Sequence, residues 1–213
     1  MELPIRNWDE YYSRREFEVP GFIVSVLWEH YEKAIRKHLN TTKSSLVVME
    51  LGGANSCFYR RFKNAFPVGE YHILDNNELG LDLFAHKGYL GTSLHNVDLL
   101  RSNPASIGTL ADIVFSAGLI EHFVPEETRR IVEFHFEVAH PGGLVLMSFP
   151  TPTWIYWTFR RFLEKAGRFP PLFERPIQTA EVVPILPHLG TPLECYRIYS
   201  TILTQLLTIS RKR

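Results

Sequence analysis

Three acidic residues and a serine each follow a short apolar run of the chain, and a glycine turn follows the first of them. The four runs end in Glu50, Asp75, Asp98 and Ser116, and Gly52-Gly53 comes just after Glu50. A glycine turn after a buried strand lets the backbone approach a ligand closely. Carboxylates accept hydrogen bonds from hydroxyl and amine groups and attract cations. The pattern therefore favours a ligand that carries such groups.

The glycine turn does not fit a dinucleotide site. Counted from Gly52, the pattern Gly-x-Gly-x-x-Gly needs glycines at positions 54 and 57, where the chain has Ala54 and Cys57. The carboxylate of Glu50 would also repel a pyrophosphate. An NAD-dependent oxidoreductase is therefore disfavoured.

Short apolar runs alternate with helical patterns along most of the chain. Helices are expected at 21–39, 58–66, 125–139 and 179–190, and strands at 46–50, 71–75, 94–98, 112–116, 144–149, 195–199 and 205–209. This alternation is typical of a doubly wound α/β fold with a mostly parallel sheet of about seven strands. In such sheets ligands bind beyond the carboxyl ends of the strands, where the acidic residues lie.

Two helical additions are expected beside the main domain of residues 44–213. Residues 1–43 are predicted to form an N-terminal helical cap, in which Tyr11 and Tyr12 could close over a ligand. Residues 151–178 are predicted to form a helical insertion whose helix runs from Trp154 to Arg168. That helix is aromatic and basic, which suits a lid over an acidic or amphipathic substrate, simple packing, or contact with a membrane surface.

Composition excludes several classes of protein. The 213 residues include 45% apolar and 22% charged side chains, with 23 basic and 23 acidic residues, so binding to nucleic acid through phosphates is disfavoured. No apolar run is long enough to cross a bilayer, and the first residues do not read as a signal peptide. Cys57 and Cys195 are expected to be reduced, which fits a cytoplasmic chain. No metal ligands are assigned, and the oligomeric state is left open.

The ordered motifs resemble those of a known family. The segment 47–56, Val-Val-Met-Glu-Leu-Gly-Gly-Ala-Asn-Ser, resembles the first motif of class I, Rossmann-like, S-adenosylmethionine-dependent methyltransferases. Asp75 matches that family's ribose-binding acid and Asp98 its adenine-side acid. Residues 111–123, which include a Glu-His pair, look like the fourth-strand motif of the small-molecule "type 11" group. Residues 141–143 are similar to the turn that enters the fifth strand, so the resemblance covers roughly residues 44–150.

The resemblance implies S-adenosylmethionine as cofactor and a set of residues that bind it. These are Glu50, Gly52, Gly53, Ala54, Asn55, Asp75, Asn76, Asp98, Leu99, Ser116, Ala117 and Gly118. His122 is the first candidate for a catalytic base, if the acceptor must lose a proton. The candidates for contact with the acceptor are Tyr11, Tyr12, Trp154, Trp157 and Arg161.

The expected reaction is methyl transfer to a small-molecule acceptor, at oxygen more often than at other atoms. A lipid-linked or sugar-containing metabolite would suit the aromatic, basic insertion. The alternative is a non-catalytic, methyltransferase-like binding module. Its support is that the family prefers glycine where this chain has Ala54 and Ser56, because a positive φ angle costs alanine and serine more than glycine.

Overall fold

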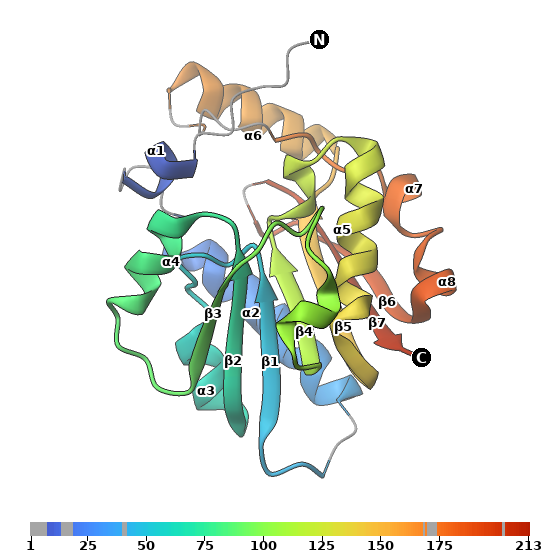
Figure 1. Cartoon of the computed structure of the whole chain (residues 1–213). Helices are drawn as coiled ribbons and strands as arrows, with labels where there is room; N and C mark the ends of the chain where they lie inside the picture. The colour runs from blue at the N-terminus through green and yellow to red at the C-terminus, as the bar shows by residue number, and fades with distance from the viewer. Residues whose placement is uncertain (1–7, 14–18, 40–41, 168, 170–173, 202) are drawn as a thin grey trace.

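The computed structural model describes residues 8–13, 19–39, 42–167, 169, 174–201 and 203–213, and a seven-stranded sheet runs through its centre (Figure 1). The strand order is β3-β2-β1-β4-β5-β7-β6. Neighbouring strands are parallel from β3 to β5, whereas β7 runs antiparallel between β5 and β6. The strands are β1 (Leu46–Leu51), β2 (Val68–Asp75), β3 (Thr92–Asn96), β4 (Ala111–Ala117), β5 (Ala139–Pro150), β6 (Gly190–Ile198) and β7 (Gln205–Lys212). The predicted doubly wound, mostly parallel sheet of seven strands is confirmed.

Helices bury both faces of this sheet. Helices α2 (Gly21–His38), α3 (Tyr59–Ala65) and α4 (Glu78–Ala85) pack on one face, where Val48 of β1 points. Helices α5 (Pro125–Glu137), α7 (Thr179–Val182) and α8 (Leu186–Leu189) pack on the other, where Met49 points. Because successive side chains of a strand point to opposite faces, a strand buried on both faces reads as a continuous apolar run. This explains the unbroken run that precedes Glu50.

The strand order reverses between β1 and β4, the two central strands. Ligands of doubly wound sheets bind in the crevice that such a reversal opens beyond the carboxyl ends of the strands. In Figure 1 the short helix α1 (Trp8–Ser13) and helix α6 (Trp154–Lys165) lie at this end of the sheet. The short 3₁₀ helix η3 (Ile120–His122) directly follows β4 on the same side, whereas η2 (Pro104–Ile107) precedes that strand.

Strands β2, β5 and β6 begin earlier than predicted, and three other elements differ from the sequence predictions in kind or extent. Strand β3 ends at Asn96 rather than at Asp98, because the carboxylate and carbonyl of Asp98 accept backbone hydrogen bonds that form a turn. The helix expected from Thr179 to Gly190 is two single turns, since Pro184 and Pro187 lack the N–H groups that a continuous helix needs. Helix α4 was not predicted, although Asn77 caps it by accepting a hydrogen bond from the N–H of Gly80 at 2.7 Å.

The two predicted additions are described only in part. Residues 1–7, 14–18 and 40–41 of the N-terminal cap lie outside the described residues, as do 168 and 170–173 of the insertion. The described helices are α1 and α2 of the cap, and α6 of the insertion. Among the described helices, none combines the length and the apolar character needed to cross a membrane.

Candidate functional site

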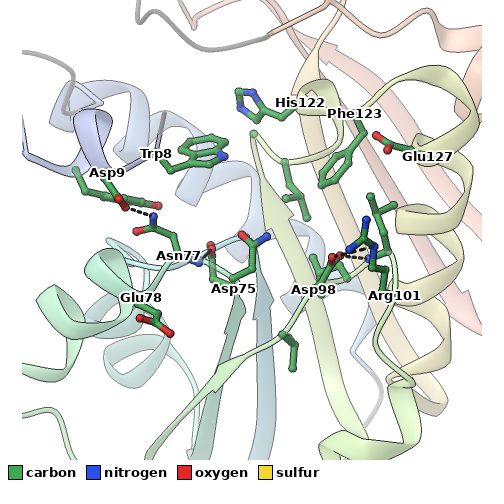
Figure 2. A pocket seen from close by; sticks show the side chains of 18 residues that line it. Trp8, Asp9, Asp75, Asn77, Glu78, Asp98, Arg101, His122, Phe123 and Glu127 are labelled. Carbon is green, nitrogen blue, oxygen red and sulfur yellow. Dashed lines mark hydrogen bonds and ion pairs between the residues drawn. The ribbon is translucent and has the colours of Figure 1, made fainter. Parts of the chain in front are cut away.

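A cavity of about 630 Å³ lies beyond the carboxyl ends of β1, β2 and β4, between α1, α4 and η3 (Figure 2). Its volume is within the range of small-molecule sites. The side chains that line it come from segments far apart in the sequence. They are Trp8, Asp9, Tyr12, Gly52, Asp75, Asn76, Asn77, Glu78, Val97, Asp98, Leu99, Leu100, Arg101, Gly118, Leu119, His122, Phe123 and Glu127.

The turn after β1 needs its two glycines. Gly52 has a φ of +69°, and a Cβ atom added there would lie 2.5 Å from Cδ1 of Leu119. A Cβ atom on Gly53 would lie 2.4 Å from the carboxyl carbon of Glu50. No described residue other than glycine has a positive φ, so Ala54 and Ser56 occupy the turn without backbone strain. The sequence departures that supported a non-catalytic module therefore cost this loop nothing.

Asp75 ties the turn after β1 to the turn after β2. Its Oδ2 accepts a hydrogen bond from the N–H of Ala54 at 3.1 Å, and its Oδ1 accepts one from the N–H of Asn77 at 2.9 Å. The side chain also lines the cavity, near its centre in Figure 2. Burial raises the pKa of Asp75, and the backbone N–H groups of Asn77 and Ala54 oppose that rise. Since a carboxylate has about four acceptor positions, Asp75 can still accept hydrogen bonds from a ligand.

Asp98 lies in the turn after β3 and faces the same cavity. Its Oδ1 accepts a hydrogen bond from the N–H of Leu100 at 2.9 Å, and its Oδ2 lies 3.7 Å from Nε of Arg101. Leu99 and Leu119 add buried apolar surface to the cavity wall. A hydrogen-bond acceptor in a wall that also has apolar side chains suits a heterocyclic ring with an exocyclic amine.

Glu50 lies beneath the glycine turn rather than in the cavity wall. Its side chain is 4% exposed, and its Oε2 accepts a hydrogen bond of 2.6 Å from the hydroxyl of Tyr71. Burial raises the pKa of Glu50 to about 7, and hydrogen bonds from Ser56 and Tyr71 oppose the rise. Gly53, Ala54 and Asn55 are also absent from the wall, and the N–H of Ala54 is bound by Asp75. These four predicted ligand residues therefore lie in or beneath the loop in this structure.

Of the three residues predicted at the end of β4, only Gly118 reaches the cavity. Ser116 is 1% exposed, and its hydroxyl lies 2.9 Å from Nε2 of His135 on α5. Its carbonyl oxygen accepts a hydrogen bond of 2.9 Å from the hydroxyl of Tyr31 on α2. Strand alternation turns Ser116 into the α5 layer, so the prediction that it lines the ligand site is not met, and Ala117 is likewise absent from the wall.

His122 lies in the cavity wall, and α1 packs against it. The rings of Trp8 and His122 meet edge to face with centroids 4.8 Å apart. Asp9 of the same helix accepts a hydrogen bond of 2.7 Å from the amide of Asn77, which Figure 2 shows at the left of the cavity. Helix α1 is thereby joined to η3 on one side and to the start of α4 on the other.

The two tyrosines of α1 differ in position. Tyr12 lines the cavity, and its ring meets that of Tyr11 edge to face with centroids 5.2 Å apart. Burial, followed by the charge of Asp75, raises the pKa of Tyr12 well above its usual value. Tyr11 does not line the cavity but packs edge to face on Trp8, with centroids 5.6 Å apart. Of the two tyrosines expected to close over a ligand, Tyr12 is thus the one that lies in the cavity wall.

The predicted acceptor residues of α6 are not part of this cavity. Trp154 is 77% exposed and Trp157 is 44% exposed, and Arg161 is exposed as well. None of the three is among the lining residues, because α6 buries Tyr156 on its inner side and turns these side chains outward. The predicted lid is therefore not seen in the described structure.

Sequence reasoning missed about half of the cavity wall. Asn77 and Glu78 follow β2 just as Asp75 does, so their position after a strand end was a usable signal. Phe123 and Glu127 follow the Glu-His pair closely and could have been inferred in the same way. Trp8 and Asp9 carry no such signal, since their place depends on how α1 packs. Among the described residues, no three metal-ligating side chains are grouped to hold a metal ion.

Two methyltransferases of solved structure share this fold. The N-methyltransferase NodS from Bradyrhizobium japonicum WM9, in complex with S-adenosyl-L-homocysteine, is 17% identical over 86% of each chain, with a TM-score of 0.61. Magnesium protoporphyrin IX methyltransferase (ChlM) from Synechocystis PCC 6803, with bound S-adenosyl-L-homocysteine, is 14% identical over 97% of this chain and 93% of its own, with a TM-score of 0.67. No family model matches the chain, and no curated protein matches it either.

These comparisons establish the class of fold. The chain has the fold of class I S-adenosylmethionine-dependent methyltransferases, as its sequence motifs suggested. The cavity described above lies at the strand-order reversal, where doubly wound folds bind their ligands.

Proposed function

We propose that the protein transfers a methyl group from S-adenosylmethionine to a small-molecule acceptor. The observation that carries this proposal is the meeting of Gly52, Asp75 and Asp98 in one cavity wall, each at or just after the carboxyl end of a different parallel strand. The motif resemblance assigns Gly52 to the cofactor-binding turn, Asp75 to the ribose and Asp98 to the adenine of the cofactor.

The residues present fit this cofactor. Asp75 keeps acceptor positions for two ribose hydroxyls, and Asp98 keeps an acceptor beside the apolar surface of Leu99 for an exocyclic amine. Gly52 and Gly118, both with positive φ, bring backbone close to the space between the ends of β1 and β4. When bound, S-adenosylmethionine would supply a sulfonium methyl group, which passes to the acceptor atom as the carbon–sulfur bond breaks and S-adenosylhomocysteine leaves.

The protein's own contribution to the reaction is mainly the placement of the acceptor. Holding two reactants in line supplies a large part of the rate enhancement of such displacements. Within the described wall, His122 is the one histidine. Its imidazole can accept the proton that a hydroxyl group loses on methylation. Oxygen is therefore the acceptor atom that we propose, and Trp8 holds the imidazole in place by packing against its ring.

The charge of the wall favours an uncharged or cationic acceptor. Asp9, Asp75, Glu78, Asp98 and Glu127 all line it, whereas the basic side chain in the described wall besides His122 is Arg101, which lies near Asp98. An anionic acceptor would be repelled by this surface. Since α6 does not contribute to the cavity, the acidic acceptor that its basic side chains suggested is replaced by a neutral, hydroxyl-bearing one.

Calorimetric titration with S-adenosylmethionine and with S-adenosylhomocysteine tests the cofactor part of the proposal. No heat of binding for either nucleoside at millimolar concentration would contradict it. Release of S-adenosylhomocysteine in the presence of hydroxyl-bearing and amine-bearing acceptor sets then tests the reaction. Tight nucleoside binding without release on any acceptor would instead favour a non-catalytic binding module.

A further inference from the structure

Helix α6 carries a cluster of exposed aromatic side chains. Trp154, Trp157, Phe159 and Phe162 are 77%, 44%, 43% and 66% exposed. They are four of the eleven large apolar side chains that are exposed in the described part of the chain, on one helix of 12 residues. Single exposed apolar side chains are common on protein surfaces, but a cluster of this size marks an interaction surface.

The inner side of α6 is fixed without these aromatic side chains. The buried Tyr156 donates a hydrogen bond of 3.1 Å to Oε1 of Glu174, and Arg160 donates to the hydroxyl of Tyr156 at 2.7 Å. Arg160 also donates to the carbonyl of Glu174 at 2.9 Å. Thr153, which caps the helix, hydrogen-bonds to Thr204 at 2.8 Å. The four outward aromatic side chains are therefore not needed to hold the helix on the fold.

Basic side chains stand among the exposed aromatic ones. Trp154, Trp157, Arg161 and Lys165 follow each other at steps of three and four residues, so they lie along one side of the helix. Arg161 and Lys165 are exposed, and neither forms an ion pair within the described structure, whereas Glu164 is bound to Arg160 at 2.8 Å. We call Trp154, Trp157, Arg161, Phe162 and Lys165 the outer face of α6; Phe159 lies about 140° around the helix from Trp154 and is not part of it.

We propose that the outer face of α6 docks the protein on an anionic lipid surface. Tryptophan prefers the headgroup level of a bilayer, phenylalanine can enter the acyl boundary, and arginine and lysine attract anionic headgroups. A helix lying flat in the interface can use all three at once. This inference goes beyond methyl transfer and does not depend on it, because the outer face shares no residue with the cavity wall.

The charges argue against a second copy of the chain as the partner. In a symmetric dimer the same patch meets itself, so the basic side chains of two copies would lie against each other. An anionic membrane neutralises them instead. In Figure 1 helix α6 crosses the end of the molecule that also holds α1, so docking would turn this end toward the lipid.

Flotation of the full chain with lipid vesicles tests the proposal. We expect binding to vesicles of phosphatidylcholine and phosphatidylglycerol at about three to one, and at least tenfold weaker binding to phosphatidylcholine alone. The double variant Trp154→Ser/Phe162→Ser should weaken binding to the mixed vesicles more than tenfold. The matched control is Leu90→Ser/Leu110→Ser, which removes two apolar side chains that are 84% and 45% exposed before β3 and β4 and should bind as the parent does.

A charge-reversal pair completes the test. Arg161→Glu/Lys165→Glu should lose the preference for anionic vesicles, whereas Lys33→Glu/Arg60→Glu on α2 and α3 should keep it. All four variants should retain the parent's melting temperature and near-ultraviolet circular dichroism spectrum, which shows that the fold is intact. Absence of vesicle binding by the parent, or equal binding by the α6 variants, overturns the proposal. The proposal is also overturned if the parent forms a dimer and does not bind vesicles, and the Trp154→Ser/Phe162→Ser variant is a monomer. That result would show that the outer face of α6 is a self-association surface.

Discussion

Replacement of Asp75 separates its role in the loop from its role toward a ligand. Asp75→Ala removes the acceptor for the N–H groups of Ala54 and Asn77, at 3.1 and 2.9 Å. Each unpaired N–H costs about 1–2 kcal/mol, so we expect a loss of about 2–4 kcal/mol in the free energy of unfolding. For a chain of this length that lowers the melting temperature by about 5–15 °C.

The same substitution should weaken nucleoside binding. Loss of hydrogen bonds from ribose hydroxyls to a charged acceptor costs about 1.5–3 kcal/mol, which is an increase of about 10- to 150-fold in the Kd for S-adenosylhomocysteine. Calorimetric titration gives the Kd, and a thermal melt of the same sample gives the stability. Asp75→Asn, which keeps the shape of the side chain, should show the binding defect with a smaller loss of stability.

The control is Asn103→Ala, which removes a helix cap outside the cavity. The side chain of Asn103 accepts a hydrogen bond of 3.0 Å from the N–H of Ala105 at the start of η2. Its loss should lower stability by about 0.5–2 kcal/mol and leave the Kd unchanged. If Asp75→Ala lowers the melting temperature but leaves the Kd at its parent value, Asp75 is part of the scaffold only and the assigned ribose position is wrong.

Three further predictions concern stability. Burial raises the pKa of Glu50 to about 7, so between about pH 4.5 and 7 the folded state holds a proton that the unfolded state lacks. The free energy of unfolding should therefore fall by about 3 kcal/mol as the pH rises from about 4.5 to 7. In urea titrations across this range, Glu50→Gln should remove the fall. Burial lowers the pKa of His135 to about 4, so stability should instead be lost by about 3 kcal/mol as pH falls from about 6.5 to 4, and His135→Gln should remove that loss in acid-range titrations. Gly52→Ala should destabilise by about 1–3 kcal/mol more than Gly142→Ala, because both have a positive φ but only Gly52 faces a side chain within 4 Å; equal urea midpoints would contradict this.

The sheet could be predicted from sequence because its signal is local. A strand buried on both faces must be apolar throughout, and an acid or glycine must follow where the chain turns at its end. The run before Glu50 and the run before Asp75 both satisfy this, and each forms a strand of the expected kind. Asp75, Asp98 and Gly52 could be placed in the cavity for the same reason, since they end or follow parallel strands.

What could not be predicted depends on side-chain direction and on long-range packing. Ser116 lies at the right height on β4, but the alternation of the strand directs its hydroxyl to His135. The direction of the Glu50 side chain likewise places its carboxylate beneath the turn, where it accepts a hydrogen bond from Tyr71. Trp154 lies on a helix whose orientation is set by the hydrogen bonds of Tyr156, which no periodicity in the sequence reveals. A pattern of residue types predicts which strand end a residue occupies. Its hydrogen-bond partner depends on how the helices and strands pack in the folded chain.

The shortness of α1 has a thermodynamic consequence. A helix of six residues does not persist alone in water, so α1 depends on contacts with the rest of the fold, among them those of Trp8 with His122, of Asp9 with Asn77 and of Tyr12 in the cavity wall. A ligand in the cavity contacts α1 only when this segment is helical. Association is thus coupled to local ordering, and its heat-capacity change should be more negative than the ligand's own apolar area accounts for.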